Sequence, residues 1–235
     1  MPARGAGKRR EKACRRAEIK RGSPSLGTIN NQRGIARTAE LYARGGASAI
    51  SVLTEPDYFQ GSLEYLAHLR GTIDLPLMRK DFLFHPRQLY EARVWGADGA
   101  LLISSYLSLE QIRLMVAEAH DLGMWLLLEG HSVDDMKRIA ECHDLGGGDF
   151  VGINNRNLHT LELDVEHGQK VLSRLAQDMV SLPAPLIMES GFDSLDSLAV
   201  YDKVANGFLI GSFLMSLPEG QIASKTAELS GLAAF

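Results

Sequence analysis

The stretch Leu75-Pro76-Leu77-Met78, which leads directly into Arg79-Lys80-Asp81-Phe82, shows the pattern that decides the fold. A short apolar run ends in charged side chains, and this arrangement recurs along the chain. Apolar runs of this length, bounded by turn residues and separated by helical patterns, are typical of buried parallel strands. The other examples are Leu126-Leu127-Leu128 before Glu129, Phe150-Val151-Gly152-Ile153 before Asn154, Leu186-Ile187-Met188 before Glu189-Ser190, and Phe208-Leu209-Ile210 before Gly211-Ser212.

The pattern favours an α/β protein built as a (β/α)8 TIM barrel. In such a barrel the carboxyl ends of all strands meet on one face, so residues far apart in the sequence can share one pocket. A doubly wound open sheet is the structural rival, but no G-x-G-x-x-G sequence follows the first expected strand. We expect strands near residues 17–20, 48–53, 76–80, 99–103, 124–129, 149–153, 185–189 and 207–211.

A weak internal repeat supports this architecture. Gly46, Gly96, Gly148 and Asn206 each lie between a helical pattern and an apolar run, at a spacing of two βα units. We expect these residues to end a helix in the left-handed conformation before every second strand. Expected helix starts are Pro86 in a first turn and Ser108, Ser132, Asp164 and Ser194 as N-caps.

Length and composition describe an ordinary globular chain with one domain. The 235 residues are 45% hydrophobic and 23% charged, and no linker composition divides them after residue 17. No apolar run reaches the roughly 18 residues that a membrane span needs, and no apolar stretch follows the basic start as it would in a secretory signal. The two cysteines, Cys14 and Cys142, are too few for a disulfide framework. We therefore expect a cytoplasmic protein.

Charge is unevenly distributed along the chain. Residues 1–16 hold seven Lys or Arg against one Glu, so this segment carries +6 and the remainder −10 of the net −4. We expect residues 1–16 to be a disordered basic segment and residues 17–235 to form the barrel. A basic arm can bind nucleic acid, but no aromatic residues or nucleic-acid module accompany it, and the body is acidic. Neither nucleic acid nor a membrane is an expected partner.

The expected strand ends carry a set of groups suited to acid–base chemistry. Two lysines and up to three carboxylates in one dry pocket shift the pKa values of one another, which suits proton transfer on an anionic substrate. No His/Cys/carboxylate grouping has metal-ligand spacing, so no metal is expected. The set comprises Glu18, Lys20, Lys80, Glu129, Asn154, Arg156, Glu189 and Ser190.

Six motifs in order resemble the indole-3-glycerol phosphate synthase family. The resemblance extends from about residue 17 to residue 216, nearly the whole expected barrel. The motifs are Glu18-Ile19-Lys20-Arg21-Gly22-Ser23-Pro24-Ser25, Ala49-Ile50-Ser51-Val52-Leu53-Thr54-Glu55 with Tyr58-Phe59-Gln60-Gly61-Ser62, Arg79-Lys80-Asp81-Phe82, Gly152-Ile153-Asn154-Asn155-Arg156-Asn157-Leu158, Glu189-Ser190-Gly191, and Ile210-Gly211-Ser212-Phe213-Leu214-Met215.

The resemblance implies an activity without metal or organic cofactor. The family converts 1-(2-carboxyphenylamino)-1-deoxyribulose 5-phosphate to indole-3-glycerol phosphate, carbon dioxide and water. Lys80 matches the acid of ring closure, and Glu129 and Lys20 match the acid–base pair of dehydration, with the acid of that step left open. Glu18 would orient Lys20, which could also pair with the carboxylate that is lost.

The remaining family positions imply contacts with the substrate. Asn154, Arg156 and Ser190 would hold its hydroxyl and carboxylate groups, and Phe82 and Leu158 would pack against its aromatic ring. Glu189 also belongs to the expected binding set. A phosphate site is expected in such a barrel independently of the family, because loops after the last two strands commonly present backbone N–H groups to phosphate. Gly191, Gly211 and Ser212 lie in those loops, and Ser23 would add a hydroxyl.

The start of the chain departs from the family pattern. Seventeen residues precede Glu18, whereas the family carries a longer segment with a helix that covers part of the active-site face. Arg15 and Arg16 also stand where the first strand is expected to be apolar, and an arginine in a barrel wall is costly unless it is paired. The alternative function is therefore a catalytically impaired barrel of the same family that binds a phosphorylated ligand or a pathway partner. In either case the expected ligand is a phosphorylated small molecule and the expected state is a monomer.

Overall fold

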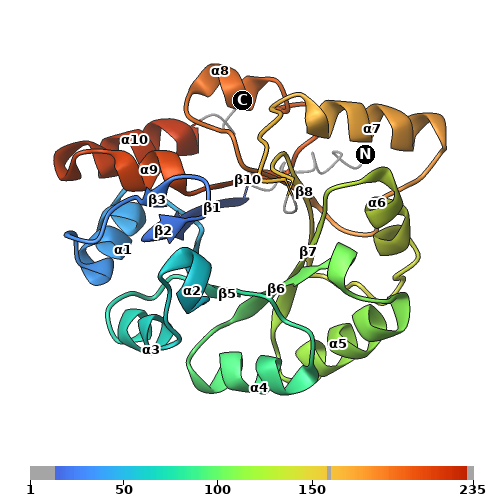
Figure 1. The fold of residues 1–235 in the computed structure, drawn as a ribbon, viewed down its shortest axis with the longest axis horizontal. Coiled ribbons are helices and arrows are strands. Elements are labelled where there is room, and N and C mark those ends of the chain that lie inside the picture. Colours follow the sequence, from blue (N-terminus) through green and yellow to red (C-terminus); the bar gives the residue numbers. More distant parts are fainter. Residues whose placement is uncertain (1–13, 158–159, 232–235) are drawn as a thin grey trace, which may run out of the picture.

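Eight parallel strands close into a barrel in a computed structural model that describes residues 14–157 and 160–231 (Figure 1). The order around the barrel is β1-β10-β9-β8-β7-β6-β5-β4, so the predicted TIM barrel is confirmed. A short hairpin, β2 (Gly22–Ser23) with β3 (Gly27–Thr28), follows the first barrel strand. The barrel strands are β1 (Cys14–Ile19), β4 (Ala49–Leu53), β5 (Leu77–Lys80), β6 (Gly99–Ile103), β7 (Trp125–Gly130), β8 (Phe150–Asn154), β9 (Leu186–Glu189) and β10 (Gly207–Ile210).

Helices surround the barrel and follow its strands in chain order (Figure 1). The outer ring consists of α1 (Ile35–Arg44), α3 (Glu64–Arg70), α4 (Pro86–Val94), α5 (Leu109–Asp121), α6 (Val133–Ala140), α7 (His167–Gln177), α8 (Leu195–Ala199) and α10 (Glu219–Gly231). Three shorter elements lie in the loops after strands: α2 (Pro56–Phe59), the 3₁₀ helix η1 (Ser104–Tyr106) and α9 (Ser212–Ser216). None of the helices in the described part of the chain has the length and apolar character to cross a lipid bilayer.

Most predicted helix starts are confirmed, and one is wrong. Ser108, Ser132 and Ser194 each form a capping box, in which the hydroxyl accepts a backbone N–H at the third helical position. Asp164 does not cap α7, which begins at His167. Its carboxylate instead accepts the backbone N–H of Glu166 within the preceding turn, and this local bond shifts the helix start downstream.

The residues before alternate strands act in two different ways. Gly46 (φ +78°) and Gly96 (φ +98°) adopt the predicted left-handed conformation, whereas Gly148 and Asn206 are not among the positive-φ residues. The prediction is wrong at Asn206 because its side chain makes a different bond, accepting the N–H of Leu186 at the start of β9. Asp98 does the same for Leu77, the first residue of β5, and Asp149 for Leu126, the second residue of β7.

The first strand starts earlier than predicted. Strand β1 includes Cys14, so the expected boundary at residue 17 is wrong by three residues, and residues 1–13 lie outside the described residues. Arg16 is 2% exposed, and its guanidinium lies 3.8 Å from the ring centroid of Phe150 and 4.7 Å from that of Trp125. These π faces offset part of the cost of burying the charge, so a residue that reads as polar in sequence occupies a strand.

Two apolar cores flank the strands. The larger one lies between the sheet and the helices, and the smaller one fills the barrel interior. Alternation along each strand sends one residue outward and the next inward, which produces both cores from the same apolar runs. The interior core consists of Met78, Leu101, Ile103, Leu127, Ile187 and Leu209.

Candidate active site

A cavity of about 640 Å³ opens at the carboxyl ends of the strands. The predicted strand-end residues converge there, and Glu189 contacts Lys80 within the same group. Leu158 lies outside the described residues, so the structure does not place it. The other predicted residues all line the cavity: Glu18, Lys20, Ser23, Lys80, Phe82, Glu129, Asn154, Arg156, Ser190, Gly191, Gly211 and Ser212.

Strand alternation explains why these side chains face the same space. Met78 and Leu127 fill the barrel interior, and Lys80 and Glu129 follow two positions later on the same strand faces. Side chains two residues apart on a strand point to the same side. The polar layer therefore lies directly above the apolar interior core, which shields it from water on one side.

Glu18 connects the two lysines of the site. Its Oε1 lies 2.9 Å from Lys20 Nζ, and its Oε2 lies 3.2 Å from Lys80 Nζ. Lys80 Nζ also lies 3.0 Å from Glu189 Oε2. Both carboxylates are almost completely buried, so these ion pairs are poorly screened by solvent. One lysine thus stands between two carboxylates drawn from strands at opposite ends of the sequence.

These contacts fix the ionisation of Glu18 and Lys80. Burial by itself would raise the pKa of Glu18, but the ammonium groups of Lys20 and Lys80 lower that pKa to about 2. Burial opposes the charge on Lys80, but Glu18, Glu189 and Glu129 outweigh it and hold the pKa of Lys80 well above its ordinary value. At neutral pH the site holds a carboxylate and an ammonium group in contact.

The pKa of Glu129 is raised, whereas that of Glu18 is lowered. Burial, followed by the charge of Glu189, raises the pKa of Glu129 to about 8, although Lys80 acts against the shift. Asn154 Nδ2 donates a hydrogen bond to Glu129 Oε1 at 2.9 Å, and Asn154 Oδ1 accepts the N–H of Arg156. Because the second bond occupies Oδ1, the amide nitrogen of Asn154, and not its oxygen, points at Glu129. The carboxyl group therefore holds its proton near neutral pH and is held in one orientation.

Gly211 provides room for this arrangement. A Cβ at residue 211 would overlap Glu18 Oε1 and lie 3.0 Å from Glu18 Cβ. A glycine where a strand gives way to a loop often marks the close approach of another group. Here the group is the carboxylate that holds both lysines, so Gly211 contributes to the geometry of the site as well as lining it.

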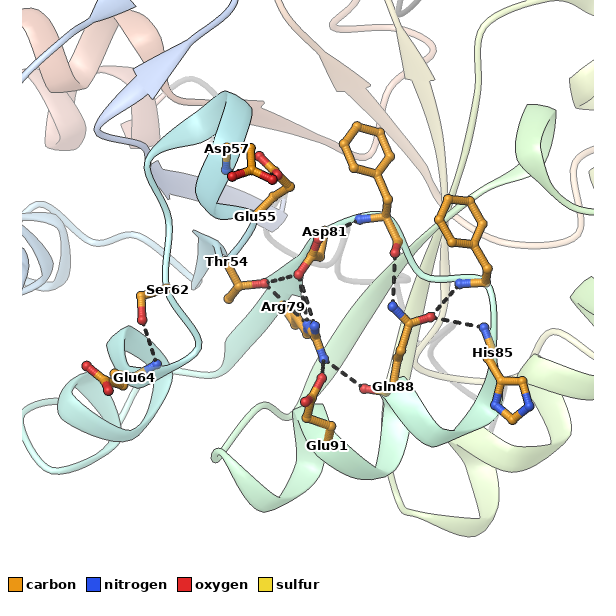
Figure 2. A network of polar contacts seen from close by, with 12 residues as sticks. Thr54, Glu55, Asp57, Ser62, Glu64, Arg79, Asp81, His85, Gln88 and Glu91 are labelled. Carbon is orange, nitrogen blue, oxygen red and sulfur yellow. Dashed lines mark hydrogen bonds and ion pairs between the residues drawn. The ribbon is translucent and has the colours of Figure 1, made fainter.

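An ion network on the outer side of β5 was not predicted from the sequence (Figure 2). Arg79, 4% exposed, donates from Nε to Thr54 Oγ1, and its Nη2 lies 3.0 Å from Asp81 Oδ2. Its Nη1 bonds the carbonyl of Gln88 at 3.0 Å and Glu91 Oε2 at 2.6 Å. Thr54 also donates to Asp81 Oδ2 at 2.6 Å. The network ties the ends of β4 and β5 to α4, and so anchors the backbone at the next residue, the site lysine.

The same network extends to the loop that carries Phe82. Gln88 Nε2 donates to the carbonyl of Phe82, and Asp81 Oδ1 accepts the Phe82 N–H at 2.8 Å. Figure 2 shows these bonds beside the turn that leads into α4. Phe82 packs against Phe59 with ring centroids 6.4 Å apart, and both rings line the cavity. Phe59 was missed as a site residue, although its motif was part of the resemblance.

The opposite side of the cavity has an unusual backbone. Ser190 (φ +69°) and Gly191 (φ +87°) are consecutive residues in the left-handed region, directly after β9. Gly211 precedes α9, whose first residue is Ser212, so the first N–H groups of that helix lack partners in a preceding turn. Ser23, nearly buried in the β2–β3 hairpin, also lines the cavity.

Comparison with known sequences decides the family. The sequence model of indole-3-glycerol phosphate synthase matches residues 6–227. The chain belongs to the indole-3-glycerol phosphate synthase family. The indole-3-glycerol phosphate synthase of Carboxydothermus hydrogenoformans is 39% identical over 204 residues, covering 86% of this chain and 74% of its own. That of Roseiflexus sp. is 39% identical over 223 residues, covering 92% and 79%.

Solved structures agree with the barrel fold of the indole-3-glycerol phosphate synthase family. The 3-hexulose-6-phosphate synthase of Salmonella typhimurium has a TM-score of 0.67 at 10% identity, covering 93% of this chain and 97% of its own. The tryptophan synthase alpha chain of Legionella pneumophila has a TM-score of 0.59 at 18% identity, with 94% and 88% covered. At these identities the likeness shows the fold alone.

Proposed function

We propose that this chain converts 1-(2-carboxyphenylamino)-1-deoxyribulose 5-phosphate to indole-3-glycerol phosphate, carbon dioxide and water. The observation that carries the proposal is the contact of Lys80 with both Glu18 and Glu189, beside a protonated Glu129, in one cavity. An ammonium group between two carboxylates, with one neutral acid beside them, suits a reaction with several proton transfers. Membership in the family supports this substrate.

Ring closure requires stabilisation of a developing alkoxide. An anthranilate ring carbon attacks the ribulose carbonyl carbon, the carbonyl π bond opens onto its oxygen, and that oxygen takes a proton from Lys80. Glu18 and Glu189 keep the lysine ammonium charged and aimed, so it can supply both the positive charge and the proton. Loss of carbon dioxide then returns the C–C bonding pair to the ring.

Dehydration requires an acid for the leaving hydroxyl. Glu129 is suited to this step because its pKa of about 8 keeps it protonated at neutral pH. The proton goes to the departing oxygen and water leaves with the C–O bonding pair. The Glu129 carboxylate left by this transfer then takes a proton from the neighbouring ring carbon, and the C–H bonding pair forms the double bond that completes the indole. Because Glu129 supplies this proton, Lys20 is not needed as the acid. Paired with Glu18, it would bind the anthranilate carboxylate during ring closure, until that group leaves as carbon dioxide.

The remaining residues would bind the substrate. Phe82 supplies an aromatic face for the anthranilate ring, and Leu158 is proposed for the same role. Asn154, Arg156 and Ser190 would bind hydroxyl and carboxylate groups. Glu189 would act chiefly through its contact with Lys80.

The phosphate would bind where β9 and β10 end. Gly191, Gly211 and Ser212 line the cavity, and their backbone N–H groups would bind the anion. Ser23, in the hairpin that also lines the cavity, would add a hydroxyl. Such donors stabilise an anion without a lysine. A crystal grown with excess phosphate should show the anion against these residues, and an anion bound elsewhere or not at all would contradict the proposal.

The enzyme is favoured over a catalytically impaired barrel. Lys80, Glu129 and Asn154 are all present and hydrogen-bonded or ion-paired as an acid–base site requires. We further propose a monomer that works in the cytoplasm, where phosphorylated intermediates of amino-acid biosynthesis are made. The activity is tested by mass spectrometry of the product, which should be lighter than the substrate by carbon dioxide and water. Recovery of unchanged substrate would contradict it.

A further inference from the structure

Asn155 lies behind the wall of the cavity and is fully buried. Its backbone N–H donates to the carbonyl of Glu189 at 2.9 Å, and its carbonyl accepts the N–H of Asp164 at 3.1 Å. Its side chain donates from Nδ2 to the carbonyl of Ser190 at 3.2 Å and accepts at Oδ1 the N–H of Gly168 at 3.0 Å. One residue thus joins the ends of β8 and β9 to the start of α7.

The Ser190 carbonyl belongs to a stretch of backbone in the left-handed conformation, which residues with a side chain rarely adopt. Ser190 has φ +69°, and it is followed by Gly191 at φ +87°. A residue with a side chain in the left-handed region persists where surrounding bonds hold it there, and such positions cluster at functional sites. The Asn155 amide donates a hydrogen bond to this carbonyl and so helps to hold it.

The space around the Asn155 amide is also restricted. A Cβ at Gly168 would lie 2.9 Å from Asn155 Oδ1 and 3.0 Å from the Tyr201 hydroxyl. The start of α7 therefore closes against the amide and leaves it one orientation, with Nδ2 toward Ser190. Because Ser190 and Gly191 line the cavity, the position of this amide is transmitted to the cavity wall.

We propose that Asn155 is a positioning residue that holds Ser190 and Gly191 in their left-handed conformation and thereby shapes the phosphate end of the substrate site. The expected effect on KM rests on the proposed function. The effect of Asn155 on the conformation of Ser190 and Gly191 does not, because it is a property of the protein without substrate.

The test compares Asn155→Ala with Asn206→Ala. Asn206 is a matched control because its side chain also bonds β9, at Leu186 on the opposite end of the strand. N155A should raise the KM for the substrate about tenfold, the factor that corresponds to one lost buried hydrogen bond, with a smaller change in kcat. N206A should lower the melting temperature while leaving KM unchanged. A KM unchanged in N155A would overturn the proposal.

A double-mutant cycle with Ser190→Gly separates positioning from general damage. Glycine adopts positive φ without strain, so it needs no amide to hold it. In the S190G background, N155A should change KM by less than about threefold, because the two effects are coupled. An equal effect of N155A in both backgrounds would overturn the proposal. If N155A does not fold, Asn155→Leu, which fills more of the volume without a donor, takes its place in the cycle.

Hydrogen exchange provides a readout that does not depend on turnover. Backbone amides in residues 189–192 should exchange faster in N155A than in the wild type, and this difference should shrink in the S190G background. S190G alone, with Asn155 intact, should raise the melting temperature through strain relief, and an unchanged or lower value would overturn the strain argument. If the wild-type chain does not turn over the substrate, the proposed function fails, and the exchange comparison alone decides the role of Asn155.

Discussion

The carboxylate of Glu189 occupies the space in which a side chain at Gly152 would begin. A Cβ at residue 152 would overlap Glu189 Oε1, while Oε2 of the same group lies 3.0 Å from Lys80 Nζ. Glu189 is fully buried, so its carboxylate has little freedom to move aside. A glycine in the interior of β8 therefore determines whether a carboxylate on β9 can stand beside the lysine on β5.

Gly152→Ala should disrupt the site while leaving the barrel folded. The added methyl group displaces the Glu189 carboxylate, so kcat should fall at least about tenfold through loss of a contact that orients the acid. Gly220→Ala is the matched control, because a Cβ at residue 220 meets nothing within 4 Å. G220A lies in α10 and should raise stability slightly. Equal kinetics for the two variants would refute the spatial argument.

The pH dependence of turnover should report Glu129. Because the protonated form donates to the leaving hydroxyl, kcat should decline as pH rises through about 8, the raised pKa of Glu129. Glu129→Gln should be slow at every pH and should lack this decline, while substrate still binds. A steady-state profile from pH 6 to 10 measures both properties. If E129Q altered KM only, the acid role of Glu129 would be wrong.

The same carboxyl group should make stability depend on pH. Its pKa is about 8 in the folded chain against 4.5 as the ordinary value, so the folded state binds more protons between those limits. Its contribution to stability is therefore lost as pH rises through this window. Relative to E129Q, which cannot titrate at this position, the wild-type free energy of unfolding should fall between pH 5 and 8. Urea unfolding at several pH values measures the difference, and parallel profiles would contradict it.

Removal of the Arg79 guanidinium should destabilise the barrel. Arg79→Met leaves Asp81 and Glu91 without their partner, and loss of one member of a largely buried pair costs about 2–4 kcal/mol once partial exposure of Glu91 is considered. Arg37→Met removes an exposed pair with Glu219 and should have little effect. Denaturant unfolding of both variants measures the contrast. Similar midpoints would show that the network is not a structural anchor.

The sequence predicts the strand ends well because two physical signals coincide there. The apolar run Leu126-Leu127-Leu128 is expected to be buried, and burial of the adjoining Glu129 is costly unless it has partners. The change from apolar to charged residues therefore predicts both the end of β7 and its polar tip. The parallel barrel then requires such tips to share one face. For this reason the sequence alone predicts that Lys80, Glu129 and Asn154 lie together.

Other features depend on distances that no linear pattern contains. Arg79 precedes Lys80, and the sequence does not show that its guanidinium bonds both a strand end and α4. Arg16 reads as a residue of a basic segment, yet it stacks on the rings of Phe150 and Trp125, which lie far away in sequence. The role of Gly152 follows from the space around Glu189. These positions become apparent only when separate strands are placed side by side.

The central claim is that Lys80, held between Glu18 and Glu189, is the acid of ring closure. The direct measurement is the fluorescence signal of indole-3-glycerol phosphate formation by the purified wild-type chain, by Lys80→Met and by the exposed-lysine control Lys203→Met. We predict turnover by the wild type and K203M, and a loss of at least about 10² in K80M with substrate still bound. Equal turnover by K80M and the wild type would contradict the account.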